Sequence, residues 1–288
     1  MTKARRMSAR RNRILLATGL LVLAGCASAP GVSRARGGGY LDDARLVGTL
    51  FEGAVALLEG GKATDMDVLR RQLEGQDRPP FPRLSLPSAD RRKRSPAELY
   101  EASKHGVLVV GVLCGCETCK GKRGPVASGF VLAADGVVVT NYHVVDQNNK
   151  LAMAVMTYEG QVFPVTAVLA ADEANDIAIL QVDAPPLEPL PLATGAPVGT
   201  SVTVISHPSK ALYTLSEGIV SRRFLKHRDG RAVPKLAITA DFGRGSSGAP
   251  VLNEFGAVVG MVEATHSIYC DKDEGKRNLQ MVVKTCIP

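Results

Sequence analysis

The two runs Val126-Ala-Ser-Gly-Phe-Val-Leu-Ala133 and Gly136-Val-Val-Val-Thr140 indicate the fold of this chain. Both are short and mostly apolar, and turn residues separate them, as is typical of β-strands. Nine further runs of this kind occur, at 106–114, 151–157, 161–170, 177–183, 201–206, 218–225, 235–240, 257–264 and 279–285. No helical crossover of about 12 residues separates them, so we expect an all-β barrel or sandwich rather than a parallel α/β sheet.

The chain before these strands has a helical period. Apolar residues of the segment 41–75 recur at three- and four-residue steps, and Gly60-Gly61 separates a first helix from a second, shorter one that ends at Leu73. Residues 76–94 are rich in Pro and Arg and indicate a linker. Ser95-Pro96-Ala97-Glu98 combines an N-cap, a proline at the first helical position and an acid at the third, which predicts another short helix to about Ser103.

Composition excludes several classes of protein. The 288 residues are 45% hydrophobic and 22% charged, an ordinary globular mixture rather than that of a disordered, collagen-like or coiled-coil chain. No run of 18 apolar residues could form a bilayer-spanning helix. The net charge of +7 depends on six basic residues within residues 1–25, which contain no acid, and the remainder carries +1. We therefore expect no nucleic-acid partner, and the run 91–94 is interpreted as solvated linker.

The N-terminus is typical of an export signal. A basic region precedes the mostly apolar stretch 14–25, which is too short to span a membrane. Leu23-Ala24-Gly25-Cys26 resembles the lipobox of bacterial lipoproteins, in which the cysteine is acylated and becomes the new N-terminus. The alternative is an ordinary signal peptide cut after residues 27–29, Ala-Ser-Ala. We expect a signal peptide at 1–25, lipidation of Cys26 and a flexible tether at 26–40.

Three segments of the β region carry residues suited to nucleophilic catalysis. They are Thr140-Asn-Tyr-His-Val-Val145, Asp176-Ile-Ala-Ile-Leu180 and Gly245-Ser-Ser-Gly248. A serine hydroxyl needs a base to take its proton, and that base needs an acid to orient it. His143, Asp176 and Ser247 supply these three roles in that chain order, at spacings of 33 and 71 residues.

With these motifs, residues 100–288 resemble trypsin-like serine peptidases of the bacterial HtrA/Deg-like branch. The resemblance implies two six-stranded antiparallel β-barrels of the chymotrypsin-like kind over residues 95–288, preceded by the short helical segment. It implies that His143 is the general base and acid, that Asp176 orients it and that Ser247 is the nucleophile. The backbone N–H groups of Gly245 and Ser247 then form the oxyanion hole.

The chain departs from this pattern at three places. Ser246 stands where digestive trypsin-like enzymes carry the aspartate that receives the freed N-terminus, so activation through that ion pair is not expected. Ala249 replaces a common glycine. No residues follow Pro288, so the PDZ domain typical of HtrA enzymes is expected to be absent. A latent or inactive protease-fold module for binding or chaperoning is therefore the alternative to a serine endopeptidase.

Residues near Ser247 are candidates for the substrate pocket. Phe242 and Arg244 lie just upstream of it, and Thr265 lies on the expected far wall. Asp241 has two interpretations: counted along a trypsin it is a pocket acid that favours Arg or Lys, whereas aligned with HtrA enzymes it is structural and Phe242 gives an apolar pocket. We favour the apolar pocket.

Five cysteines remain beyond Cys26. Cys114, Cys116 and Cys119 lie close together between the first two expected strands, where they predict either a disulfide-stapled loop or, as the second choice, a zinc site. We favour the disulfide, and expect no cofactor, for an exported protein that acts on proteins or peptides in the cell envelope from a lipid anchor.

Overall fold

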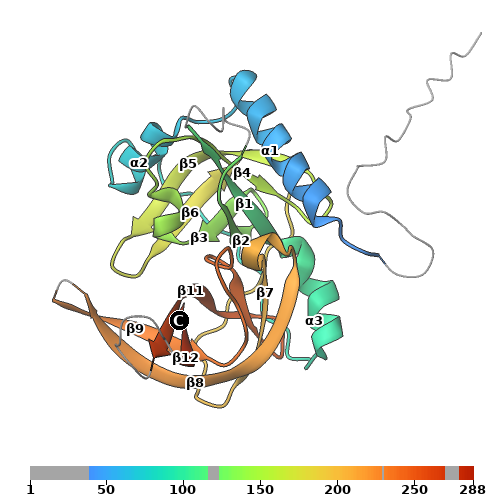
Figure 1. The fold of residues 1–288 in the computed structure, drawn as a ribbon, viewed down its shortest axis with the longest axis vertical. Helices are drawn as coiled ribbons and strands as arrows, with labels where there is room; N and C mark the ends of the chain where they lie inside the picture. The colour runs from blue at the N-terminus through green and yellow to red at the C-terminus, as the bar shows by residue number, and fades with distance from the viewer. Residues whose placement is uncertain (1–38, 116–122, 229, 270–278) are drawn as a thin grey trace, which may run out of the picture.

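The computed structural model describes residues 39–115, 123–228, 230–269 and 279–288. Within them, twelve strands form two closed antiparallel barrels of six strands each (Figure 1). Short helices precede the first barrel. The structure therefore confirms the mainly β fold with two six-stranded barrels and a helical N-terminal segment that the sequence predicts. Among the described residues, no helix combines the length and apolarity needed to cross a membrane.

The first barrel holds the strands in the order β1-β2-β3-β6-β5-β4. Its strands are β1 (Val107–Cys114), β2 (Val126–Ala133), β3 (Val137–Thr140), β4 (Lys150–Met156), β5 (Val162–Asp172) and β6 (Ile177–Val182). Strand β1 is buried on both faces. Leu108, Val110 and Val112 fill the barrel. Val107, Val109 and Leu113 face outward. The outward residues pack against α1 (Asp43–Glu59), through Leu46 and Leu50.

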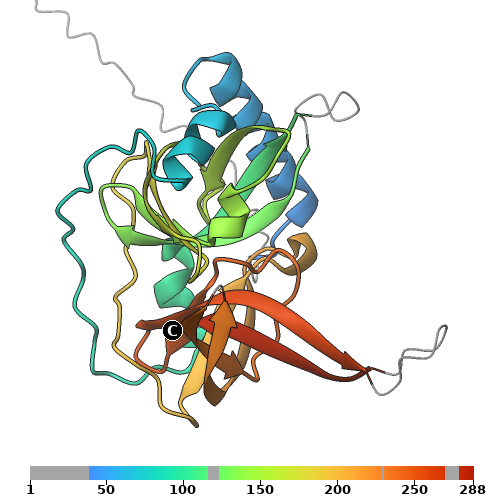
Figure 2. The ribbon, with the colours of Figure 1, turned by 90° about the vertical axis from the view of Figure 1, so that its left-hand side faces the viewer.

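The remaining helices and the linker connect the two barrels from outside. Helix α2 (Met66–Leu73) adds its apolar face to the core of the first barrel. Residues 76–94 form neither helix nor strand and run along the side of the molecule past both barrels (Figure 2). They end at Arg94, which bonds to the carbonyls of Glu254 and Phe255 in the second barrel. Helix α3 (Pro96–Ser103) follows with the capping box that the sequence predicts, and η1 (Lys104–Gly106) leads into β1.

The second barrel has the order β10-β11-β12-β9-β8-β7. Its strands are β7 (Ser201–Ser206), β8 (Thr214–Arg228), β9 (Arg231–Ile238), β10 (Pro250–Asn253), β11 (Val258–Tyr269) and β12 (Leu279–Ile287). The core is made of small and branched side chains, such as Val204, Val251 and Val262. The pairs β8–β9 and β11–β12 extend beyond the barrel as two-stranded ribbons (Figures 1 and 2).

Candidate active site

His143 lies at the junction of the barrels, in α4 (Tyr142–Val145), a single helical turn directly after β3. Val144 and Val145 of this turn are buried in the core of the first barrel and anchor it. The side chain of His143 is half exposed. The apolar residues that follow the histidine therefore fix the turn that presents its imidazole.

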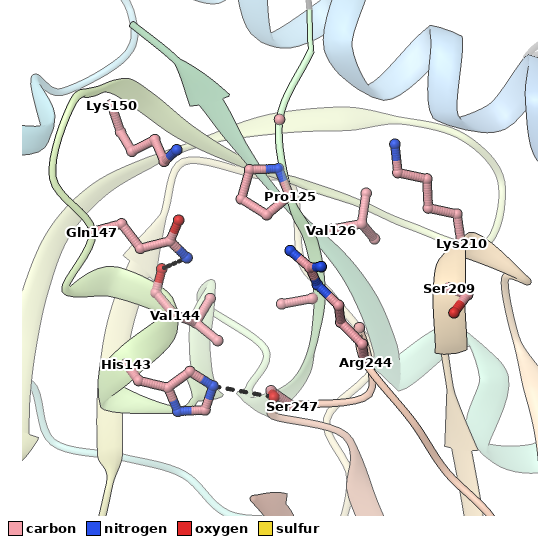
Figure 3. Close-up of a pocket in the computed structure, with 13 residues that line it drawn as sticks. Pro125, Val126, His143, Val144, Gln147, Lys150, Ser209, Lys210, Arg244 and Ser247 are labelled. Atoms are coloured by element: carbon pink, nitrogen blue, oxygen red, sulfur yellow. Dashed lines mark hydrogen bonds between the residues drawn. The ribbon is translucent and has the colours of Figure 1, made fainter. Parts of the chain in front are cut away.

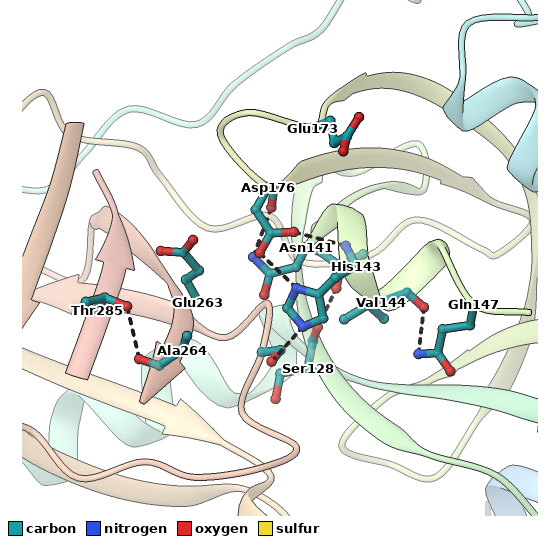
Figure 4. Close-up of polar contacts among 12 residues, drawn as sticks. Ser128, Asn141, His143, Val144, Gln147, Glu173, Asp176, Glu263, Ala264 and Thr285 are labelled. Atoms are coloured by element: carbon teal, nitrogen blue, oxygen red, sulfur yellow. Dashed lines mark hydrogen bonds and ion pairs between the residues drawn. The ribbon is translucent and has the colours of Figure 1, made fainter. Parts of the chain in front are cut away.

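Asp176 holds His143 by two contacts, one to its backbone and one to its imidazole (Figure 4). Its Oδ1 accepts the backbone N–H of His143 at 3.0 Å, and its Oδ2 lies 2.8 Å from Nδ1. The aspartate side chain is only 8% exposed. The side-chain amide of Asn141 donates to the backbone carbonyl oxygen of Asp176 at 3.0 Å. Because the carboxylate accepts from Nδ1–H, the other ring nitrogen presents a lone pair. That nitrogen, Nε2, lies 3.1 Å from the hydroxyl of Ser247.

Ser247 is held in place by the opposite barrel. The N–H of Ser128, in β2, donates to the carbonyl oxygen of Ser247 at 2.8 Å, and the Ser128 hydroxyl donates to that of Gly245 at 3.0 Å. The next residue, Gly248, has φ +87° and lies so close to β2 that a Cβ atom would be 2.1 Å from the carbonyl oxygen of Ser128. The nucleophile segment therefore needs glycine at 248 to pack against the first barrel.

Gly245 has a backbone shape suited to an oxyanion hole. Its φ is +100°, and a Cβ atom there would lie 2.5 Å from the carbonyl oxygen of His207. The carbonyl of Arg244 accepts the N–H of Ser209 at 2.6 Å, so the N–H of the same trans peptide, on Gly245, points away from Ser209. In the described part of the chain, neither this N–H nor that of Ser247 has a protein acceptor. Two backbone donors are thus available beside the Ser247 hydroxyl.

The loop 207–213, which holds the Arg244–Gly245 peptide bond through Ser209, has an uncommon backbone conformation. Ser209, Lys210 and Tyr213 all have positive φ, between 51° and 71°. His207 closes the loop: its Nδ1 accepts the N–H of Tyr213 at 3.0 Å, and its Nε2 lies 3.1 Å from the carbonyl oxygen of Leu108. Complete burial lowers the pKa of His207 to about 4, so the ring is neutral at pH 7 and donates to Leu108 through Nε2–H.

Helix α1 contacts the same loop. The carboxylate of Asp43, in the first turn of α1, accepts the N–H of Leu212 at 3.0 Å. The ammonium of Lys210 lies 5.9 Å from the ring centre of Phe51. The side chains of Leu212 and Tyr213 join the cluster that α1 covers. Helix α1 is thereby connected, through the loop 207–213, to the peptide bond between Arg244 and Gly245.

Ser246 is fully buried behind the nucleophile. Its hydroxyl lies 3.0 Å from the hydroxyl of Ser206 and accepts the N–H of Gly243. Its own N–H donates to the carbonyl oxygen of Gly243 at 3.0 Å. Neutral hydrogen bonds thus support the segment 243–247 at the position where digestive trypsin-like enzymes carry an aspartate, and the ion pair is absent here, as expected from Ser246.

A small pocket of about 180 Å³ lies beside Ser247. Phe242, Arg244 and Thr265, all predicted as pocket residues, line it together with Val262, Glu263 and Ala264. Asp241 lies elsewhere: its side chain is 89% exposed, and its carboxylate pairs with Lys284 in β12. Asp241 therefore does not line the small pocket, whereas the neighbouring Phe242 does.

Most of the cysteine hypotheses concern residues outside the described chain. Cys26, Cys116 and Cys119 belong to segments that the structure does not describe, and the predicted staple or zinc site stays a prediction. Cys114 ends β1, opposite Lys150. Cys286 is fully buried in the second barrel, where desolvation raises the pKa of its thiol. No cluster of three metal-ligating side chains occurs among the described residues.

Two closed six-stranded barrels with a serine, a histidine and an aspartate in contact at their junction define a chymotrypsin-like domain. Residues 127–261 match the family model described as a trypsin-like peptidase domain. The matched region includes His143, Asp176 and Ser247 and leaves out helices α1 to α3.

The chain is similar to HtrA and Deg-type proteins. It is 33% identical over 148 residues to Protease Do-like 1, chloroplastic, of Arabidopsis thaliana, a match that covers 49% of this chain and 33% of the relative. It is 32% identical over 174 residues to Serine protease HTRA2, mitochondrial, of Bos taurus, which covers 57% and 37%. A probable periplasmic serine endoprotease DegP-like of Hahella chejuensis is 32% identical over 148 residues, which covers 49% and 31%. The match thus spans about a third of each relative's length.

Solved structures share the fold. The crystal structure of Deg5 superposes with a TM-score of 0.52 at 25% identity and covers 67% of this chain and 87% of that chain. The HtrA-type protease AlgW with tripeptide superposes with a TM-score of 0.55 at 19% identity and covers 68% and 60%. These neighbours agree with the double barrel described above.

Sequence reasoning missed Ser128, Ser209 and Asp43. Ser128 carries a usable signal, since it is a polar residue in an otherwise apolar run, and the structure shows it fully buried. Ser209 acts through its backbone, and its side chain gives no signal. Asp43 is a first-turn acid, which is common at helix starts and therefore unspecific.

Proposed function

We propose that this protein is a serine endopeptidase that cleaves peptide bonds through an acyl-enzyme, with Ser247 as nucleophile, His143 as base and Asp176 as its orienting acid. The observation that carries the proposal is the continuous contact from Asp176 Oδ2 through the imidazole to the Ser247 hydroxyl, at 2.8 and 3.1 Å. The relatives named serine proteases and the trypsin-like peptidase match support the same activity.

The chemistry follows from these positions. As the Ser247 oxygen attacks the scissile carbonyl carbon, Nε2 of His143 takes the hydroxyl proton, and the Asp176 carboxylate stabilises the resulting imidazolium. The carbonyl oxygen becomes an oxyanion that the N–H groups of Gly245 and Ser247 stabilise. Collapse of this intermediate breaks the C–N bond, and Nε2–H gives its proton to the leaving amine. Water then repeats the sequence on the acyl ester and restores the free hydroxyl.

Labelling with a fluorophosphonate tests this proposal. The intact protein should become covalently labelled and should degrade an unfolded protein substrate, whereas Ser247→Ala and His143→Ala should do neither. Ser201→Ala and His227→Ala are matched controls, because both residues are exposed and lie away from the junction. No labelling of the correctly folded protein would favour the alternative, a latent or inactive protease-fold module for binding or chaperoning.

The proposed place of action is the bacterial cell envelope, with Cys26 as the lipid attachment site. The sequence Leu23-Ala24-Gly25-Cys26 at the end of the apolar stretch motivates it, and the periplasmic assignment of DegP-like relatives supports export. Incorporation of radiolabelled palmitate tests it. Cys26→Ser should abolish incorporation, and it leaves the other candidate cleavage site, after Ala29, intact. Export without incorporation in the unmodified protein would contradict the anchor.

A further inference from the structure

A cleft of about 630 Å³ lies between the barrels on the side of Ser247 away from the small pocket. His143 and Val144 line one wall, Val126 of β2 lies behind, and Ser209 with its loop forms the other wall (Figure 3). The small pocket shares only Ser247 and Arg244 with this cleft. A chain that crosses Ser247 therefore has the small pocket on one side and the cleft on the other.

The position of the proton donor indicates which half of a substrate enters the cleft. In the proposed reaction, His143 gives its proton to the leaving amine, so the residues after the scissile bond must lie on the side of the imidazole. His143 lines the cleft and does not line the small pocket. The cleft therefore receives the C-terminal half of the substrate, which leaves as the new amine.

The cleft is strongly cationic. Among the described residues, its lining includes Arg244, Lys150 and Lys210, which come from three separate segments, and it includes no carboxylate. Figure 3 shows the Arg244 side chain extending into the middle of the cleft from the segment before Ser247. Within the described residues, none of these three cations forms an ion pair.

The acids that the structure describes near the cleft do not neutralise this surface. Asp146, just after α4, pairs with Arg70 at 3.4 Å. Asp43 accepts the N–H of Leu212. Glu52 lies in the neighbouring groove along α1, where it lines the wall with Lys210 and Arg123. No described carboxylate therefore pairs with Arg244 or Lys150 at the cleft.

We propose that this cleft binds acidic side chains, so that the enzyme selects substrates with Asp or Glu among the first residues after the scissile bond. The inference rests on the proposed peptidase function and specifies its substrate class. The guanidinium of Arg244 can bond a carboxylate with two parallel N–H groups, and Lys150 adds a second positive charge. Because the cleft is open to solvent, each acid contributes modestly, and the preference depends on ionic strength.

Cleavage of a randomised peptide library by the full-length protein, read by mass spectrometry, tests this inference. We expect Asp and Glu to be enriched about two- to fivefold at one or more of the three positions after the scissile bond at low salt. The enrichment should shrink at about 0.5 M salt, where exposed charges are screened. The double variant Arg244→Gln/Lys150→Gln should bring it close to the library frequency.

The control is a double variant that removes two positive charges at a different place on the surface. Arg222→Gln/Lys226→Gln neutralises two exposed cations on β8 and should keep the enrichment. If the intact protein cleaves peptides without acidic enrichment, or if both double variants lose it equally, the inference is wrong and the peptidase function stands. If the intact protein cleaves no peptide and resists the fluorophosphonate, the proposed function fails and the inference with it.

Discussion

The backbone N–H of Ser128, in the first barrel, donates to the carbonyl oxygen of Ser247, in the second, at 2.8 Å. The hydroxyl of the same serine donates to Gly245 at 3.0 Å. One buried residue of β2 thus holds both ends of the short segment that contains the nucleophile and the two proposed oxyanion donors. The geometry of the site depends on how the two barrels are joined as well as on the His143, Asp176 and Ser247 side chains.

Removal of the Ser128 hydroxyl should slow acylation and leave the fold intact. Ser128→Ala keeps the N–H bond to Ser247 and loses the bond to Gly245, a loss of about 1 kcal/mol that corresponds to about a fivefold lower rate. The measurement is the second-order rate constant of fluorophosphonate labelling. Ser221→Ala is the matched control, because its hydroxyl also donates to a backbone carbonyl, that of Ala237, far from the site. Equal rates in the two variants would disprove this role of Ser128.

Gly245→Ala should nearly abolish activity. The added Cβ would lie 2.5 Å from the carbonyl oxygen of His207, at a φ of +100° that side chains rarely adopt. Loss of one oxyanion donor lowers kcat by about 10²- to 10³-fold. Gly243→Ala provides the comparison, since a Cβ there meets nothing within 4 Å and no positive φ is involved. A fully active Gly245→Ala protein would show that this N–H does not stabilise the oxyanion.

Asp43→Ala should weaken the oxyanion hole from a distance. The variant removes the acceptor for Leu212 N–H and loosens the loop whose Ser209 N–H holds the Arg244 carbonyl. We expect fluorophosphonate labelling to slow by about two- to tenfold. Asp43→Asn keeps an acceptor oxygen and should restore most of the rate.

A second measurement separates the oxyanion hole from the triad. In a Ser247→Cys background, alkylation by iodoacetamide depends on the thiolate and its histidine, and it forms no oxyanion. Asp43→Ala should leave this alkylation rate unchanged. A parallel fall in both rates would instead indicate general disruption of the site.

Stability should fall with acid because of His207. Its pKa is lowered to about 4 in the folded protein from 6.5, so between these values the unfolded chain binds a proton that the folded chain excludes. The free energy of unfolding therefore decreases as pH falls through this window, by about 3 kcal/mol at pH 4, and this contribution levels off only below pH 4. Urea unfolding from pH 7.5 to 4 measures the slope.

Replacement of the titrating ring checks this assignment. His207→Asn keeps an oxygen that can accept Tyr213 N–H, and it should be less stable at pH 7.5 but show a shallower loss toward pH 4. His227→Asn changes an exposed histidine and should keep the slope of the unmodified protein. An unchanged slope in His207→Asn would assign the acid sensitivity to other groups.

The sequence predicted most strands and missed those whose pattern carries little information. Strand β10 is only four residues long and directly follows the nucleophile motif, so it was not predicted. Strand β8 begins at Thr214, before the predicted start at 218, and is exposed along most of its length. A ribbon that is solvated on both faces lacks the alternation of apolar and polar residues on which the prediction depends.

What the sequence determined by itself was the mainly β fold and the order of His143, Asp176 and Ser247, because these follow from residue type and local spacing. The resemblance that these motifs carry implied the double barrel. Only the tertiary structure decided which residues support the nucleophile segment and its neighbouring loop. The Ser128 hydroxyl bonds to Gly245, 117 positions away, and the Asp43 carboxylate bonds to Leu212, 169 positions away. Their partners are backbone N–H and C=O groups, which nearly every residue carries, so no side-chain pattern distinguishes them until the barrels close and bring them together.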